Sequence, residues 1–273
     1  MTGDGRYKCS VCGARSSVTA GTLFDRRRTP LTVWFTACWM FATGKDGVSA
    51  QSLQRALEIG SYQTAWAMLH RFRRAMVRPD RDRLKGMVEI DETYLAITDR
   101  DEPRSAQGRK NNTTKVLVAL AVEVLEPKGV GRIRLRRIAA DSAEFVVPFV
   151  QASVEPGAQV RTDGSAAYRS LTSLGYVHQQ NVMLGAKEPA HVTLAGVHRV
   201  ASLIKRWILG THHGAVQPEH LDAYLDEFVF RFNRRTSGSR GMLFYRLLQQ
   251  AVITDPVTYA DIVVPGPEQL VSA

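Results

Sequence analysis

The chain has 273 residues, a formal net charge of +10, and ordinary fractions of hydrophobic (44%) and charged (23%) residues. This length is enough for one sizeable core plus a smaller appendage, and the composition is typical of a soluble globular protein. No apolar run reaches the roughly 18 residues of a membrane span, the first residues lack the apolar core of a signal peptide, and three cysteines cannot make a disulfide framework. We therefore expect no membrane segment and a cytoplasmic location.

Most of the positive charge lies in the first third of the chain. Residues 1–85 contain 15 Lys+Arg against 6 Asp+Glu, whereas residues 86–273 contain 21 against 20. This distribution indicates a nucleic-acid-binding region attached to a near-neutral domain. The alternative, that the charge only keeps the chain soluble, stays open at this point.

The first 25 residues contain Cys9-Ser-Val-Cys12, which has the spacing of half a tetrahedral zinc site. Zinc needs four ligands, but no second C-x-x-C follows. Cys38 lies in an apolar, helix-like run and is expected in the core. We therefore predict a partial zinc ribbon over residues 1–25, in which Cys9 and Cys12 bind Zn²⁺ only if a second pair of cysteines lies upstream.

Three helices are predicted next. Residues 30–43 are apolar and favour a buried helix that starts near a proline. Ser49 is a suitable N-cap for a helix over 50–59, and Ser61 is suitable for a helix over 62–76, with a glycine between the two.

Two short helices joined by a Gly-containing turn resemble a helix-turn-helix, which we place in residues 26–80. The second of these helices carries Arg71, Arg73 and Arg74. We expect these side chains to contact DNA. The alternative is an ordinary helical hairpin with a solvated basic face.

After a charged linker, two strand-like segments each end at an aspartate. In the first, Val88 and Ile90 alternate with polar residues up to Asp91; in the second, residues 159–164 contain Asp163. Two strand-end carboxylates far apart in sequence indicate a hard-cation site that the fold assembles, because oxygen ligands suit Mg²⁺. A magnesium site on a basic protein points to phosphodiester chemistry.

The remaining pattern of the second region predicts a mixed α/β sheet with helices on both sides. Residues 99–114 are polar and predict a loop, whereas residues 116–124 predict a strand buried on both faces. Residues 132–138 alternate and predict a strand with one wet, basic face. Helices are expected over 143–153 and 165–174.

Two further helices follow. Apolar residues at helical spacing predict a helix over 196–209, stopped by Gly210, on which His198 and Lys205 share another face. The helix after Pro218 carries Glu227 among its polar residues.

Several segments, in the right order, resemble the transposases of a family of bacterial insertion sequences. These ISXO-like enzymes belong to the DDE superfamily, in the branch with an N-terminal zinc ribbon and helix-turn-helix. The resemblance covers roughly residues 9–250 and implies an RNase H-like catalytic domain over 86–250, followed by a C-terminal tail over 251–273. The segments that carry it are residues 88–94, 161–168, 205–213 and 225–235.

The resemblance also implies a mechanism: metal-dependent DNA cleavage and strand transfer at the ends of the element, with two Mg²⁺ (or Mn²⁺) ions held between acidic side chains. Asp91 and Asp163 match the first two acids of the family. His198 stands at the third position, usually Glu or Asn, because it precedes the matching Lys205 by two helical turns. Imidazole is a poorer Mg²⁺ ligand than a carboxylate, so Glu227 is an alternative third acid.

The implied partners are double-stranded DNA, as element ends and target, and further copies of the chain assembled on it. Lys205 and Arg206 would bind backbone phosphates. Two alternatives stay open: a catalytically decayed DNA-binding relative, and a metal-dependent nuclease of the same fold. Strand transfer to a target would separate the transposase from the nuclease.

Overall fold

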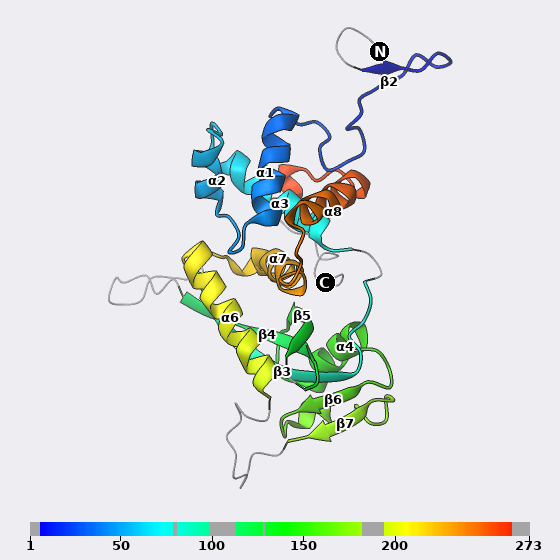
Figure 1. Cartoon of the computed structure of the whole chain (residues 1–273), viewed down its shortest axis with the longest axis vertical. Coiled ribbons are helices and arrows are strands. Elements are labelled where there is room, and N and C mark those ends of the chain that lie inside the picture. Colours follow the sequence, from blue (N-terminus) through cyan, green and yellow to red (C-terminus); the bar gives the residue numbers. More distant parts are fainter. Residues whose placement is uncertain (1–5, 79–80, 99–112, 128, 182–193, 264–273) are drawn as a thin grey trace. The chain divides into compact units, whose positions relative to one another are not determined.

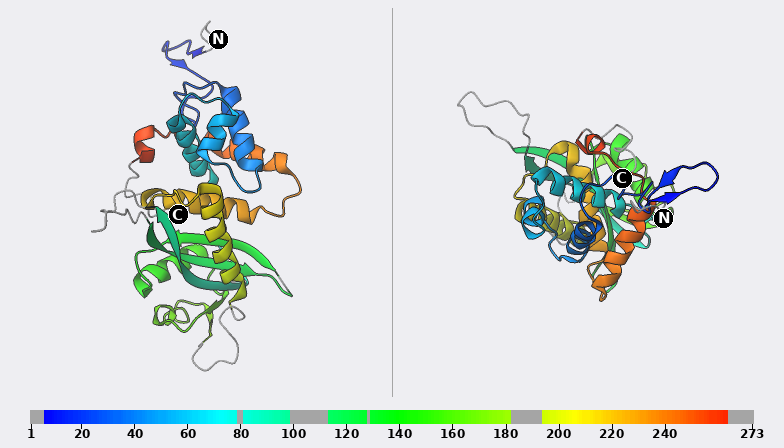
Figure 2. Two further views of the ribbon diagram at one scale, coloured as in Figure 1. Left: turned by 90° about the vertical axis from the view of Figure 1, so that its left-hand side faces the viewer. Right: turned by 90° about the horizontal axis from the view of Figure 1, so that it is seen from above.

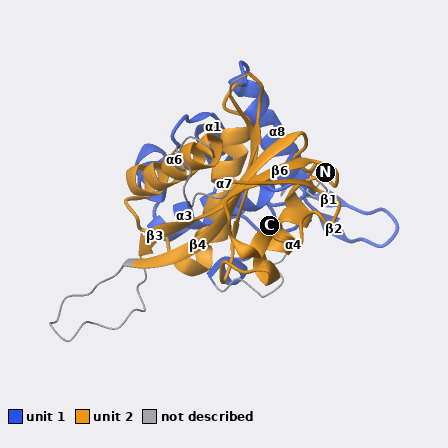
Figure 3. Ribbon diagram, turned by 90° about the horizontal axis from the view of Figure 1, so that it is seen from below, with its two compact units in different colours: residues 1–78, 237–266 blue, residues 79–236, 267–273 orange. Residues whose placement is uncertain are grey.

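The computed structural model describes residues 6–78, 81–98, 113–127, 129–181 and 194–263. The chain forms two compact units, coloured separately in Figure 3. The first contains residues 1–78 and 237–266, and the second contains residues 79–236 and 267–273. The predicted catalytic region extended to residue 250, whereas the structure groups residues 237–266 with the N-terminal helices. Most of the polar loop expected over 99–114 lies outside the described residues.

The first unit consists of helices and one small hairpin (Figure 1). Ser49 and Ser61 accept hydrogen bonds from the backbone N–H groups of Ser52 and Thr64, which confirms both predicted N-caps. The first of these helices ends earlier than expected, because Glu58 adopts a left-handed conformation with φ 51°. The elements are β1 (Tyr7–Lys8), β2 (Arg15–Ser16), α1 (Leu31–Thr43), α2 (Ala50–Ala56), α3 (Tyr62–Met76), α8 (Arg240–Ile253) and α9 (Tyr259–Val263).

Helix α8 is part of the core of the first unit. Its buried residues Leu243, Leu247 and Ala251 face inward, and α8 packs against both α1 and α3. The carbonyl of Ala251 accepts a 3.0 Å hydrogen bond from the N–H of Leu23. The helical unit is therefore assembled from two segments far apart in the sequence.

The second unit is a five-stranded mixed sheet with helices on both faces (Figure 1). Its strand order is β5-β4-β3-β6-β7, with β3, β4 and β5 antiparallel and with β6 parallel to both β3 and β7. This confirms the predicted RNase H-like α/β fold class. The elements are β3 (Met87–Thr98), β4 (Thr113–Val124), β5 (Val130–Arg137), α4 (Ala143–Ser153), β6 (Gln159–Thr162), η1 (Ala166–Tyr168), β7 (Val177–Gln180), α6 (Ala195–His212), η2 (Pro218–His220) and α7 (Leu221–Asn233).

Strand β4 is covered on both faces, as its continuous apolar sequence predicts. Val118, Leu120 and Val122 pack with α6 and α7, whereas Leu117 and Ala119 pack with α4 and η1. In the turned view on the left of Figure 2, α6 (yellow) lies across the sheet. No helix in the described part of the chain is long and apolar enough to cross a membrane.

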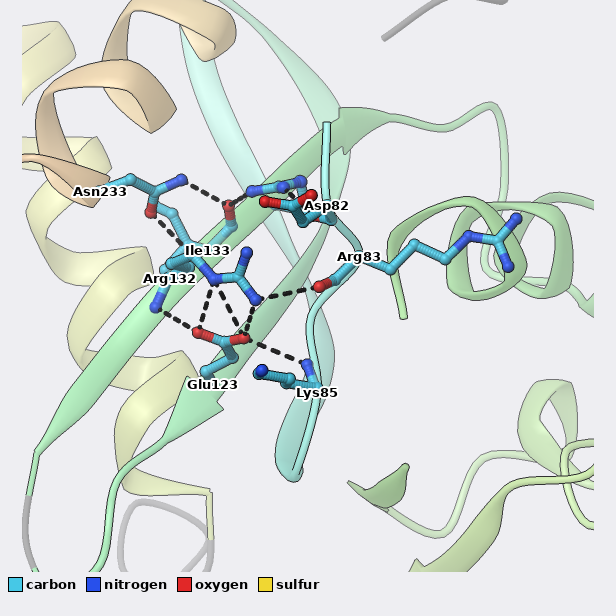
Figure 4. A network of polar contacts seen from close by, with 8 residues as sticks. Asp82, Arg83, Lys85, Glu123, Arg132, Ile133 and Asn233 are labelled. Carbon is cyan, nitrogen blue, oxygen red and sulfur yellow. Dashed lines mark hydrogen bonds and ion pairs between the residues drawn. The ribbon is translucent and has the colours of Figure 1, made fainter. Parts of the chain in front are cut away.

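The structure corrects the prediction that β5 has a solvated, basic face. Arg134 is only 6% exposed and donates to the carbonyl oxygens of Asp82 and Ile133. Next to it, Arg132 forms a 2.6 Å ion pair with Glu123, as Figure 4 shows. Arg132 and Arg134 both donate to backbone carbonyls of residues 82–83, so their charges interact with groups of the fold.

Two helix predictions also need correction. Residues 165–174 form only the short η1 and turns. Hydroxyl side chains in this segment compete with the helix for backbone hydrogen bonds; for example, Ser173 Oγ donates to the carbonyl of Ser170. Gly210 does not stop α6, which continues to His212. A single glycine costs a helix only about 1 kcal/mol, and His212 packs against the rings of Trp207 and Tyr224.

Candidate active site

Asp91 and Asp163 lie on neighbouring parallel strands. Strands β3 and β6 pair with Val88 opposite Val160 and Glu89 opposite Arg161. The same register, continued for two residues, sets Asp91 beside Asp163, which directly follows β6. Since adjacent strands are about 4.8 Å apart, the structure brings the two predicted aspartates together.

The surroundings of Asp91 oppose its ionisation. The pKa of Asp91 is raised, and burial is the largest cause. The N–H of Glu92, 2.9 Å from Asp91 Oδ1, and the imidazole of His198 act in the opposite direction and lower the pKa. The carboxylates of Asp163 and Asp141 add to the increase. Carboxylates gathered in this way repel one another when ionised, and a bound cation relieves that repulsion.

Helix α6 places His198 on the face of β3 that carries Asp91. The apolar side of the helix, which includes Val197, Val200 and Ile204, is buried against the sheet. His198 itself is partly buried, and its Nε2 is shielded from solvent without a hydrogen-bond partner among the described residues. Because a buried polar atom without a partner is costly, this nitrogen has the properties expected of a ligand for a group that the site binds.

These side chains fit a divalent cation. Mg²⁺ usually takes one or two protein carboxylates and completes its shell with water and substrate phosphates, so a closed protein cage is unnecessary. Among the described residues, no group of three or more His, Cys, Asp or Glu side chains is arranged to hold a metal ion. Asp91 and Asp163 would supply the two carboxylates, and His198 would offer a nitrogen.

Comparisons with known proteins identify the domain that carries this arrangement. A family model for the ISXO2-like transposase domain matches residues 83–233, which is more than half of the chain. The chain belongs to the ISXO2-like transposase family. Asp91, Asp163 and His198 all lie inside the matched region, and so does α7.

Two individual proteins are similar to this family member. An uncharacterized protein in transposable element ISH50 of Halobacterium salinarum is 28% identical over 236 residues, which cover 83% of this chain and 78% of the relative. A cryo-EM structure of the simian T-cell lymphotropic virus intasome, in complex with PP2A regulatory subunit B56 gamma, matches 70% of each chain at 14% identity. The TM-score of this match is 0.37.

Lys205 and Glu227, the other candidates in the transposase domain, have different surroundings. Lys205 and Arg206 are exposed on α6, and seven residues separate Lys205 from His198, or about 10 Å along the helix. Glu227 is 0% exposed on α7, where its carboxylate forms a 2.7 Å ion pair with Arg231. The structure therefore commits Glu227 to a buried ion pair and leaves Lys205 accessible.

Sequence reasoning missed three polar residues around the two aspartates. Glu92 accepts a hydrogen bond from the hydroxyl of Tyr168, and burial raises the pKa of Glu92 to about 7. Asp141 adds a further negative charge next to Asp91. The three acidic residues in the segment 89–92 could have indicated an acidic site. The pairing of β3 with β6 is needed to show which acidic side chains of the two strands lie close together.

The two N-terminal cysteines lie in the turn of the β1–β2 hairpin, and both are exposed. The backbone N–H groups of Cys12 and Val11, together with the Cys12 side chain, lower the pKa of the Cys9 thiol. A turn that stabilises a thiolate suits zinc binding, because the thiolate is the form that binds metal. The zinc site itself stays a prediction.

The predicted basic face of α3 needs a correction at Arg73. Arg73 is 2% exposed, and its guanidinium lies over the ring of Phe41, 5.8 Å from the centroid. Arg71 donates from Nε to the carbonyl of Val257 at 2.8 Å. These side chains stabilise the helical unit, and DNA contacts by Arg71 and Arg74 stay a prediction.

Proposed function

We propose that the chain catalyses metal-dependent DNA cleavage and strand transfer at the ends of its own insertion sequence. Membership of the ISXO2-like transposase family supports a transposase function. The observation that carries the proposal is the register of β3 and β6, which sets Asp91 beside Asp163 with the unpartnered Nε2 of His198 on the facing helix.

In this proposal, Asp91 and Asp163 hold the cation and His198 takes the third position. When bound, Mg²⁺ or Mn²⁺ would polarise the phosphate and stabilise charge on the attacking and leaving oxygens. Because imidazole is a softer ligand than a carboxylate, we expect this site to accept Mn²⁺ readily.

The reaction would proceed in two phosphoryl transfers. In cleavage, a water oxygen bonds to phosphorus at the element end and the 3′ oxygen leaves as a hydroxyl. In strand transfer, that hydroxyl attacks a phosphate of the target and displaces the target's 3′ oxygen. Exposed Lys205 and Arg206 would hold the DNA backbone along α6.

Recognition of the element ends is assigned to the first unit. Its α2 and α3 would act as a helix-turn-helix, and Cys9 and Cys12 would join a zinc ribbon if upstream residues supply two more ligands. Assembly of several copies on paired ends would then bring two catalytic domains to the target.

A strand-transfer assay tests the proposal. It uses DNA carrying the element ends, Mg²⁺ or Mn²⁺, and the chain with any upstream sequence that supplies a second C-x-x-C. We expect joined products from the wild type and none from Asp91→Ala or His198→Ala. Joining that survives His198→Ala but not Asp91→Ala would exclude His198 from the third position.

The same assay separates the other candidate functions. Cleavage without joining would identify a nuclease of the same fold. DNA binding without cleavage or joining, in both metals, would identify a non-catalytic relative.

A further inference from the structure

The first turn of α6 is anchored by a side chain from the sheet. The N-cap residue of α6, Leu194, provides no side-chain hydrogen bond to the free N–H groups of the helix. Glu89 of β3 takes over this role: its Oε2 accepts a 2.9 Å hydrogen bond from the N–H of Val197, and the N–H of Gly196 also donates to Glu89. A carboxylate is well suited to this position, because the N-terminus of a helix is its positive end.

Gly196 lets the start of α6 approach the Glu89 carboxylate closely. A Cβ at Gly196 would lie 2.9 Å from Glu89 Oε2 and 3.4 Å from a methyl carbon of Val122. The first of these distances is shorter than a non-bonded contact allows, so with any larger residue the Glu89 carboxylate or the start of α6 must shift. Glu89 and Gly196 therefore form one docking contact.

This docking contact lies directly beside the candidate metal ligands. Glu89 and Asp91 are two residues apart on β3 and so face the same side of the sheet, and His198 follows Val197 on α6. Glu89 is 4% exposed, and Arg161 is opposite it on β6, so its negative charge is compensated on both sides. Nothing in these contacts leaves Glu89 free to reach a substrate.

We propose that Glu89 is a positioning residue: its buried carboxylate anchors the first turn of α6 and thereby sets His198 against Asp91. The proposal rests on the metal site assigned above. It adds that the docking contact, and not only the three ligands, determines how tightly the cation is held. Residues that orient metal ligands commonly change metal affinity by about 10–100-fold when they are replaced.

The test is a Mn²⁺ titration of the full chain, followed by electron paramagnetic resonance, together with a thermal unfolding curve for each variant. Glu89→Gln keeps the shape of the side chain but turns one acceptor into a donor that opposes the backbone N–H groups. Gly196→Ala leaves the Glu89 side chain itself unchanged but places a methyl group against its carboxylate, which disturbs the docking contact. Glu123→Gln is the matched control, because Glu123 is also a buried glutamate of this sheet, but it binds Arg132 and the N–H of Lys85.

We expect Glu89→Gln and Gly196→Ala to weaken Mn²⁺ binding by about tenfold or more, and Glu123→Gln to leave it unchanged while lowering stability. The proposal is overturned if both docking variants lose stability but bind Mn²⁺ like the wild type. If Glu89→Gln does not fold, Gly196→Ala carries the same test. Failure of the metal site itself would look different, because then the wild type would bind no Mn²⁺ or Asp91→Asn would bind it equally well.

Discussion

The Glu92 carboxyl should make the second unit less stable as the pH rises. Its pKa is raised from the usual 4.5 to about 7, mainly because the carboxyl is buried. The hydrogen bond from Tyr168 lowers the pKa, whereas the neighbouring acids raise it further. Between these two values the folded state holds a proton that the unfolded state has lost. The contribution of Glu92 to stability is therefore fully present below pH 4.5 and is lost as the pH rises through 7.

The size of this effect follows from the shift. One pKa unit corresponds to about 1.4 kcal/mol, so the rise of Glu92 amounts to roughly 3 kcal/mol above pH 7. Glu92→Gln keeps an oxygen that accepts from Tyr168 but cannot ionise. We expect it to match the wild type near pH 4.5 and to exceed its stability by up to about 3 kcal/mol at pH 8.

The assay is native-state hydrogen exchange of the β3 and β4 amides in urea, with EDTA present, from pH 5 to pH 8. These amides report on the second unit alone. Glu123→Gln is the control: burial raises the pKa of Glu123, but the hydrogen bonds from Arg132 and Lys85 together lower it below the usual 4.5. The contribution of Glu123 changes mainly below pH 4.5, so Glu123→Gln should be less stable than the wild type by a nearly constant amount over this range. If the stability of Glu92→Gln stays parallel to that of the wild type over this range, the reasoning about Glu92 is wrong.

Three further outcomes are expected. Glu227→Ala removes this partner of the buried Arg231 charge and should lower the free energy of unfolding in urea by about 3–5 kcal/mol. The double variant Glu227→Ala with Arg231→Met should recover much of this loss. Lys205→Ala should weaken DNA binding about equally for all sequences and reduce the salt slope of log K by about 1, as fluorescence anisotropy would show. Removal of the residues after Thr236 deletes the buried side chains of Leu243 and Leu247 on α8, each contributing roughly 1.5–3 kcal/mol, and the smaller Ala251, so α1 and α3 should become sensitive to proteolysis.

The sequence was informative where one face of an element is uniformly apolar. The spacing of Val197, Val200, Ile204 and Ile208 predicted α6 and the side on which it is buried. The continuous apolar run of β4 predicted a strand covered on both faces. Such patterns survive in a single sequence because burial of apolar side chains follows the period of the element.

Polar residues in the interior were not predictable in the same way. Glu89, Arg73 and Arg134 look like solvent-facing charges in the sequence, yet all three are buried. Each is stabilised by groups far away in the chain: a helix N-terminus, an aromatic ring and backbone carbonyl oxygens. Their burial depends on tertiary contacts that no local pattern records.

The candidate site shows the same division. Asp91 and Asp163 were recognisable because each ends a strand-like segment, and their proximity follows from parallel pairing. The docking of Glu89 onto Gly196 was hidden, because a glycine at a helix start usually indicates only a turn. The contribution of α8 to the first unit was also hidden, since the Thr-Ser-Gly-Ser run at 236–239 marks a loop after α7 but does not show which unit the next helix joins.

Affinity cleavage with Fe²⁺ tests most directly whether Asp91, Asp163 and His198 share one cation. Fe²⁺ bound in place of Mg²⁺ generates hydroxyl radicals with ascorbate and peroxide, and these cut the chain close to the ion. The account predicts cuts near all three residues in the wild type, suppressed by excess Mg²⁺ and absent in Asp91→Asn. Cuts confined to other parts of the chain, or an unchanged pattern in Asp91→Asn, would contradict it.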